Sequence, residues 1–124
     1  MKAITVLKVS PGCSPEVISI FHTLKEMQNI VGGSIESLYP FEDPVAIVCN
    51  EEGKILGMEP NRAIYDPDTG EIVDVICGTF FVCGLTEDDF GSLTDEQIAK
   101  YSKIYETPEL FLWDGSQLVI LKMA

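Results

Sequence analysis

The stretch from Ile72 to Leu85 constrains the fold of this chain more than any other part of the sequence. It is almost continuous in β-branched, aromatic and sulfur-containing residues, and Asp74 is its only charged residue. A run of this kind is typical of a strand buried on both faces, or of one that passes from one part of a core to another. A glycine inside a strand pattern marks a bulge or the close approach of another group. We therefore predict a central strand region that breaks at Gly78 and Thr79.

Several shorter apolar segments predict further strands, because turn residues bound each of them. They are residues 3–9, 16–21, 35–39, 45–49, 55–57, 110–113 and 117–123. Residues 50–53, Asn-Glu-Glu-Gly, are typical of a hairpin loop in which Gly53 adopts a positive φ. Residues 55–57 would then be the returning strand. The last two segments flank Asp-Gly-Ser, so we expect a hairpin over residues 110–123.

Two helices are predicted from their capping residues. Thr23 and Glu26 have the spacing of a capping box, and Gly32 provides a left-handed stop. Thr94 and Gln97 form a second capping box at the start of a later amphipathic segment. The sequence therefore predicts a single α+β domain over residues 1–124, with a mostly antiparallel β-sheet and two short helices packed on it.

The charge of the chain limits its partners. There are 20 Asp and Glu against 8 Lys and Arg, which gives a net charge of −12. Because this surface repels a phosphate backbone, we expect no direct nucleic-acid binding. Two interpretations of the acidity stay open, namely solubility and an acidic face that meets a basic partner.

The four cysteines lack zinc-type spacing, so we interpret them as free thiols in a reducing compartment. No apolar run approaches the roughly 18–20 residues that span a bilayer, and the start of the chain has no signal-peptide pattern. We therefore predict a cytoplasmic protein without a membrane segment. His22 is the sole histidine, and residues 66–71 match a calcium loop poorly because the closing glutamate would be Cys77. We predict no metal and no cofactor.

Four segments occur together in an order that resembles a known family. They are residues 31–36 (Val-Gly-Gly-Ser-Ile-Glu), 46–54 (Ala-Ile-Val-Cys-Asn-Glu-Glu-Gly-Lys), 60–63 (Pro-Asn-Arg-Ala) and 78–84 (Gly-Thr-Phe-Phe-Val-Cys-Gly). In this order they resemble the domain of unknown function 3846 family, over about residues 1–111. Members of that family are carried by phages and conjugative plasmids. The resemblance implies an accessory protein of a mobile element, with a role in counter-defence.

Arg62 is the sole arginine, and it lies in a polar segment beside Asn61. A guanidinium can bind two oxygens of an anion at once, so we predict a ligand site around it. The predicted ligand-binding residues are Asn61, Arg62, Gly78, Thr79, Asn50, Gly32 and Gly33. In the alternative interpretation, Arg62 forms a salt bridge with a carboxylate and Asn61 caps a turn.

Three functional hypotheses follow. The first is a non-enzymatic protein that binds a small anionic or nucleotide-like ligand near Arg62. The second is an acidic protein–protein interaction inhibitor, of the DNA-mimic type, that occupies a basic site on a host enzyme. The third is a small enzyme, which we rank last because no catalytic constellation is visible. Phe80, Phe81 and Trp113 are expected in the core, although these aromatic residues could also line a pocket or form the face of a homodimer.

Overall fold

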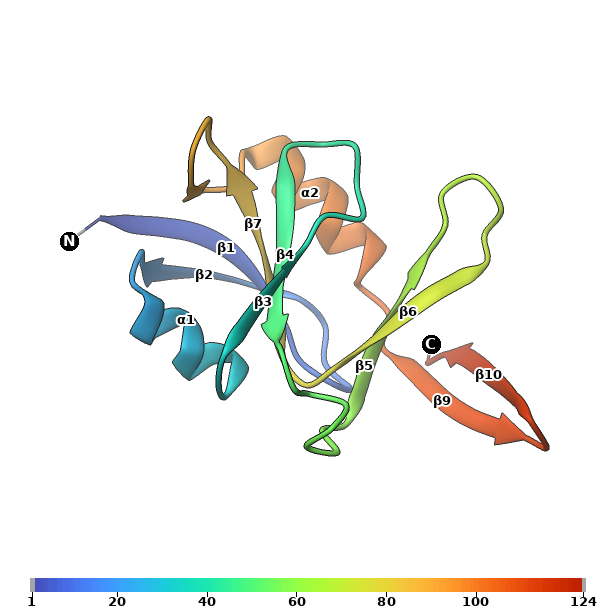
Figure 1. Ribbon diagram of the computed structural model, residues 1–124. Helices are drawn as coiled ribbons and strands as arrows, with labels where there is room; N and C mark the ends of the chain where they lie inside the picture. The colour runs from blue at the N-terminus through green and yellow to red at the C-terminus, as the bar shows by residue number, and fades with distance from the viewer. Residues whose placement is uncertain (1, 124) are drawn as a thin grey trace.

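The computed structural model describes residues 2–123 and has an α+β fold dominated by antiparallel strands (Figure 1). Its main sheet has six strands in the order β2-β1-β7-β4-β3, with β8 paired to β7. These strands are β1 (Ala3–Val9), β2 (Glu16–Phe21), β3 (Ile35–Leu38), β4 (Val45–Asn50), β7 (Phe80–Leu85) and β8 (Phe90–Gly91). The predicted fold class, with its antiparallel sheet and two helices, is confirmed.

The run that begins at Ile72 passes between two sheets. Its first half is β6 (Ile72–Cys77), which pairs with β5 (Pro60–Tyr65) in a separate two-stranded sheet. Its second half is β7, whose side chains up to Gly84 are buried at the centre of the main sheet. The predicted break at Gly78 is confirmed, since this residue has φ +88° and a Cβ there would lie 2.7 Å from Met58 Sδ. Of the two strands in this run, only β7 is buried on both faces as predicted, because Ile72 and Val73 of β6 are exposed.

The two helices cover opposite faces of the main sheet. Helix α1 (Leu24–Val31) begins at the Thr23 cap and ends at Gly32, which has φ +80°. Its buried residues Met27 and Val31 pack in a cluster that includes Phe81. Helix α2 (Asp95–Ile104) begins with the predicted capping box, with both reciprocal hydrogen bonds between Thr94 and Gln97. Tyr101 and Tyr105 pack in the other cluster, which includes Phe80. Side chains alternate between the faces of a strand, so adjacent Phe80 and Phe81 serve different cores.

The predicted hairpin over residues 50–57 is wrong. Residues 51–57 form successive turns and no strand, and Gly53 does not have a positive φ. The reason is that β3 and β7 already occupy both edges of β4, so no edge is free for a returning strand. Gly53 is required for a different reason, because a Cβ there would lie 2.5 Å from the carbonyl oxygen of Cys77.

The last hairpin is confirmed as β9 (Glu109–Asp114) and β10 (Gln117–Lys122), which form a third, two-stranded sheet. It extends from the body of the domain beside β5 (Figure 1). Phe80 and Phe81 are buried as predicted, but Trp113 on β9 is 72% exposed and lies outside the core. Within residues 2–123, neither helix is long and apolar enough to cross a membrane.

Candidate functional site

Arg62 lies on β5 with its side chain 1% exposed, and its hydrogen bonds go mainly to backbone carbonyl groups. Nη2 donates to the carbonyl oxygens of Cys13 at 2.7 Å and Tyr105 at 2.9 Å. Nη1 donates to the carbonyl oxygen of Asn61 at 3.2 Å and to its Oδ1 at 2.8 Å. Among the described residues no carboxylate forms an ion pair with this guanidinium. Arg62 therefore joins the loop after β1, strand β5 and the end of α2, without the salt bridge of the alternative interpretation.

Asn61 is fully buried and acts as a second cross-link. Its Nδ2 donates to the carbonyl oxygens of Val9 and Gly78, both at 2.9 Å. Its Oδ1 accepts from Arg62. Both amide hydrogens are therefore occupied within the protein, and they hold the end of β1 against the break between β6 and β7.

Four of the other five predicted residues, Gly32, Gly33, Asn50 and Gly78, come together around Met58 and the Asn50 amide. A Cβ on Gly32 would lie 3.6 Å from Met58 Cε, and Gly78 contacts the same side chain. Asn50 is buried, with Nδ2 donating to the carbonyl oxygen of Val31 at 3.2 Å and Oδ1 accepting from the Glu52 N–H at 2.7 Å. Gly33 lies directly against this amide. Thr79 is elsewhere, with its Oγ1 3.4 Å from Ser10 Oγ. The space between Gly32 and Gly78 is thus occupied by a methionine side chain.

One nitrogen of the Arg62 guanidinium makes no hydrogen bond within the described chain. Arg62 Nε is buried and has no hydrogen-bond partner within residues 2–123. Arg62 also lines a cavity of about 140 Å³ between β5, the end of α2 and the last hairpin. The lining residues are Phe41, Arg62, Ala63, Ile64, Tyr65, Ile104, Tyr105, Glu109 and Lys122. A buried N–H group without a partner costs free energy, and this one belongs to a residue that lines the cavity, so we take the cavity as the candidate ligand site.

Glu109 is the acidic member of this cavity and is 8% exposed. Its Oε1 accepts from the Ala63 N–H at 2.8 Å and its Oε2 accepts from the Tyr65 hydroxyl at 3.0 Å. Burial, together with the negative charge of Glu109, raises the pKa of Tyr65 to about 12. Burial also raises the pKa of Tyr105 and lowers the pKa of Arg62, whose guanidinium stays charged at neutral pH. Sequence reasoning missed Glu109, because a single acid at the start of an apolar strand carries no distinguishing pattern.

A second cavity, of about 230 Å³, lies between β4, β6 and the turns after β4. The Lys54–Asp74 ion pair and the thiols of Cys49 and Cys77 line it, together with Asn50. Burial raises the pKa of Cys49 to about 11, so this thiol is protonated and unreactive at neutral pH. All four cysteines are free, as predicted.

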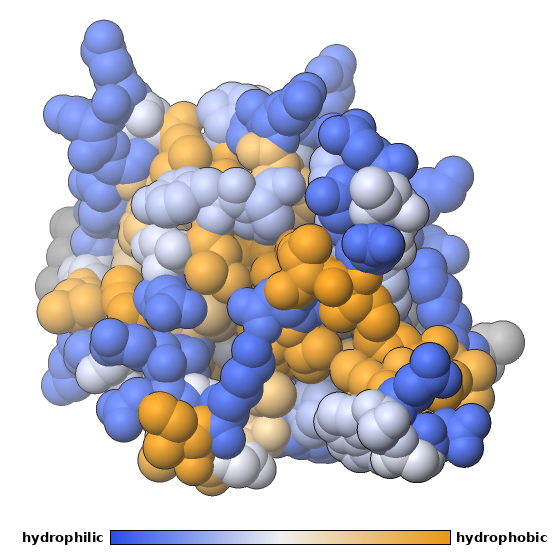
Figure 2. Space-filling view, turned by 45° about the vertical axis from the view of Figure 1, so that its right-hand side comes forward, coloured by the Kyte–Doolittle hydropathy of each residue, from blue (hydrophilic) through white to orange (hydrophobic). Residues whose placement is uncertain are grey.

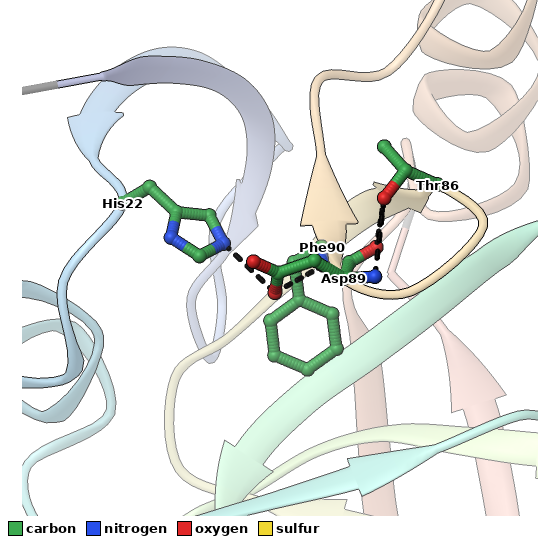
Figure 3. A network of polar contacts seen from close by, with 4 residues as sticks. All are labelled: His22, Thr86, Asp89 and Phe90. Carbon is green, nitrogen blue, oxygen red and sulfur yellow. Dashed lines mark hydrogen bonds and ion pairs between the residues drawn. The ribbon is translucent and has the colours of Figure 1, made fainter.

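Acidic side chains gather at the end of the main sheet where β7 ends and β4 begins. The loop before β4, the β7–β8 turn and the start of α2 meet there (Figure 1), and a hydrogen bond from the Leu85 N–H to the Pro44 carbonyl oxygen joins the first two. The acids are Glu42, Asp43, Glu87, Asp88, Asp89, Asp95 and Glu96. His22 Nε2 lies 3.1 Å from Asp89 Oδ1, and this contact fixes the β7–β8 turn to the end of β2 (Figure 3). The same oxygen accepts from the Phe90 N–H, and Thr86 Oγ1 donates to the Asp89 carbonyl oxygen.

Comparison with known proteins establishes the family but assigns no activity. None of the curated proteins and none of the solved structures matches the chain. One family model matches residues 2–106, which include every strand of the main sheet and both helices and end before the β9–β10 hairpin. Since the match covers well over half of the sequence, the chain belongs to the family described as Domain of unknown function (DUF3846).

Proposed function

We propose that this protein is a non-enzymatic binding protein that holds a small anionic ligand in the cavity beside Arg62. The free Nε–H of the buried guanidinium carries the proposal. Arg62 and Lys122 bring two positive charges to this cavity against the one negative charge of Glu109. Both carboxylate oxygens of Glu109 are already engaged by Ala63 and Tyr65, which reduces its repulsion of a second anion.

The cavity sets the size of the ligand. Pockets for drug-sized molecules usually measure about 300–1,000 Å³, whereas this one measures about 140 Å³. A whole nucleotide would not fit. The cavity would accept a carboxylate or phosphate group, with the apolar walls of Phe41, Ile64 and Ile104 around its substituent. A larger nucleotide-like ligand would insert its phosphate end and leave the remainder outside.

The titratable groups of the cavity support binding rather than catalysis. The pKa of Tyr65 is raised to about 12 and that of Tyr105 is also raised, so both phenols are protonated at neutral pH. A general base needs a pKa near the working pH. On the family resemblance, we place this binding role in the cytoplasm of bacteria, in an accessory protein of a phage or plasmid that acts in counter-defence.

The test uses the N–H group itself. As Arg62 is the sole arginine, its Nε–H gives one distinct resonance in ¹H–¹⁵N NMR spectra. We expect this resonance to shift on titration with at least one of inorganic phosphate, acetate and adenosine monophosphate. Ile104→Trp, at a half-exposed residue on the cavity wall, should abolish the shift, whereas Leu24→Trp on α1 should leave it unchanged. A resonance that none of these anions moves would refute the proposal.

A second candidate is supported by the gathering of acidic loops at one end of the main sheet. Asp43 is paired with Lys100, and the other six carboxylates of these segments would attract a basic surface on a host enzyme, as a DNA mimic does. Such an interaction should weaken steeply as salt rises. Glu87→Gln with Asp88→Asn should weaken capture of the partner from host lysate, while Glu51→Gln with Glu52→Gln, which changes the net charge equally elsewhere, should not. Capture that is indifferent to salt would count against this candidate.

A further inference from the structure

The β9–β10 hairpin has an apolar face that the rest of the described chain does not cover. Leu110 pairs with Leu121 and Leu112 pairs with Val119, and paired residues lie on the same face of a two-stranded sheet. With Met123, which continues the same alternation, these residues form what we call the outer face: Leu110, Leu112, Val119, Leu121 and Met123. Leu110, Leu112, Leu121 and Met123 are each 44–49% exposed.

This face is unusual for a sheet exposed to water. The solvent-facing side of an antiparallel sheet normally carries polar residues at alternate positions. The outer face has no polar residue before Asp114 and Gln117 at the turn, and Trp113 on the opposite face is 72% exposed. Figure 2 shows apolar surface running across the centre and lower right of the side on which the hairpin lies. An isolated two-stranded hairpin is at best marginally stable, so a cover over this face would also stabilise it.

We propose that the cover is the outer face of a second copy of this chain, in a symmetric dimer. The charge distribution favours this occupant. Residues 109–122 contain Glu109, Asp114 and Lys122, so they carry −1 of the net −12 and the other residues carry −11. Two copies can therefore meet at the hairpins while their acidic loops stay apart. A basic partner, by contrast, would be drawn to those loops and not to an uncharged face.

The apolar area of the outer face is smaller than that of a permanent interface. The five apolar side chains of the outer face, of which Val119 is the least exposed, present on the order of 300 Å² of apolar surface per copy. A standard interface buries about 800 Å² per partner. The shortfall from the standard area predicts a dimer that dissociates on dilution.

Sedimentation equilibrium of the full chain over a concentration series tests this proposal. We expect the apparent mass to rise from 13.7 kDa toward twice that value with concentration. Leu112→Lys places a charge in the centre of the outer face, and we expect it to raise the dimer Kd by at least about 30-fold, as loss of a hot-spot residue does. Val17→Lys is the matched control, because Val17 is a 52% exposed strand residue on β2, away from the hairpin. Its Kd should equal that of the wild type.

Salt distinguishes this dimer from an interaction through the acidic loops. Raising the salt concentration screens repulsion between two copies of charge −12, so the dimer should not weaken. A wild-type chain that stays at 13.7 kDa throughout the series would overturn the proposal, as would equal Kd values for Leu112→Lys and Val17→Lys. If circular dichroism shows that Leu112→Lys does not fold, Leu112→Thr takes its place, because threonine also favours strands. Its dimer Kd is then compared with that of Val17→Lys, and equal values would overturn the proposal.

Discussion

Replacing Arg62 with methionine tests whether this arginine holds the fold together. Methionine keeps most of the side-chain volume but removes every donor. Three hydrogen bonds of 2.7–2.9 Å would be lost, to the carbonyl oxygens of Cys13 and Tyr105 and to Asn61 Oδ1. At about 1.5–3 kcal/mol for each bond from a charged donor, the loss is roughly 5–9 kcal/mol. Relief from burying a charge offsets a few kcal/mol of it, so we expect the free energy of unfolding to fall by about 3–5 kcal/mol.

Urea unfolding followed by far-ultraviolet circular dichroism measures this change. Fluorescence of the sole tryptophan is less suitable, because Trp113 is 72% exposed in the folded chain. The protein concentration must be the same for each variant, since association would shift the apparent stability. Lys103→Met on the exposed side of α2 is the control and should change the stability by no more than about 0.5 kcal/mol. A loss below about 1 kcal/mol for Arg62→Met would refute the reasoning, since it would mean that the buried network contributes little.

Two further predictions concern the break in the long apolar run and the buried acid of the cavity. Gly78→Ala should cost about 2–3 kcal/mol in urea unfolding, from positive φ and from the contact with Met58, whereas Gly70→Ala, with φ +74° and nothing within 4 Å, should cost only about 1 kcal/mol. Glu109→Gln should lower the pKa of Tyr65 from about 12 toward its ordinary value of 10, measured as phenolate absorbance against the Tyr65→Phe variant. Because the pKa of this phenol is raised in the folded state, its contribution to stability is complete below pH 10 and is lost as the pH rises toward 12. Glu109→Gln should therefore also make the free energy of unfolding depend less steeply on pH between 10 and 12.

Local signals in the sequence predicted most of the elements correctly. Both helices begin at a Thr hydroxyl that accepts the backbone N–H three residues later, a contact specified within one turn, but the full reciprocal capping box forms only at α2, between Thr94 and Gln97. The same holds for the break at Gly78, because glycine tolerates a positive φ without steric cost and the sequence shows where glycine lies. Residues 50–57 show the limit. A turn pattern indicates that the chain reverses, but it does not say whether the preceding strand still has a free edge.

The candidate site could be predicted only in part, and the reason lies in the partners of Arg62. The lone arginine in a polar segment is at the centre of a buried hydrogen-bond network, whereas its predicted role in ligand binding stays a prediction. Its acceptors, however, are the carbonyl groups of Cys13 and Tyr105, which are 49 and 43 residues away. Every residue has a carbonyl group, so no side-chain pattern marks these two as acceptors. The cavity was unpredictable for the same reason, since it forms where β5, α2 and the last hairpin meet.

The position of the cavity links the two proposals of ligand binding and dimerisation. Glu109 and Lys122 line the cavity, and they are also the first and last residues of the paired hairpin strands. A ligand that orders these residues would order the base of the hairpin, and a second copy packed on the outer face would do the same from the other side. Each event would then make the other more favourable, and by thermodynamic necessity by the same factor. An anion that shifts the Arg62 Nε–H resonance should therefore also lower the dimer Kd, and a Kd that stays unchanged at saturation would show that the hairpin is already rigid without either partner.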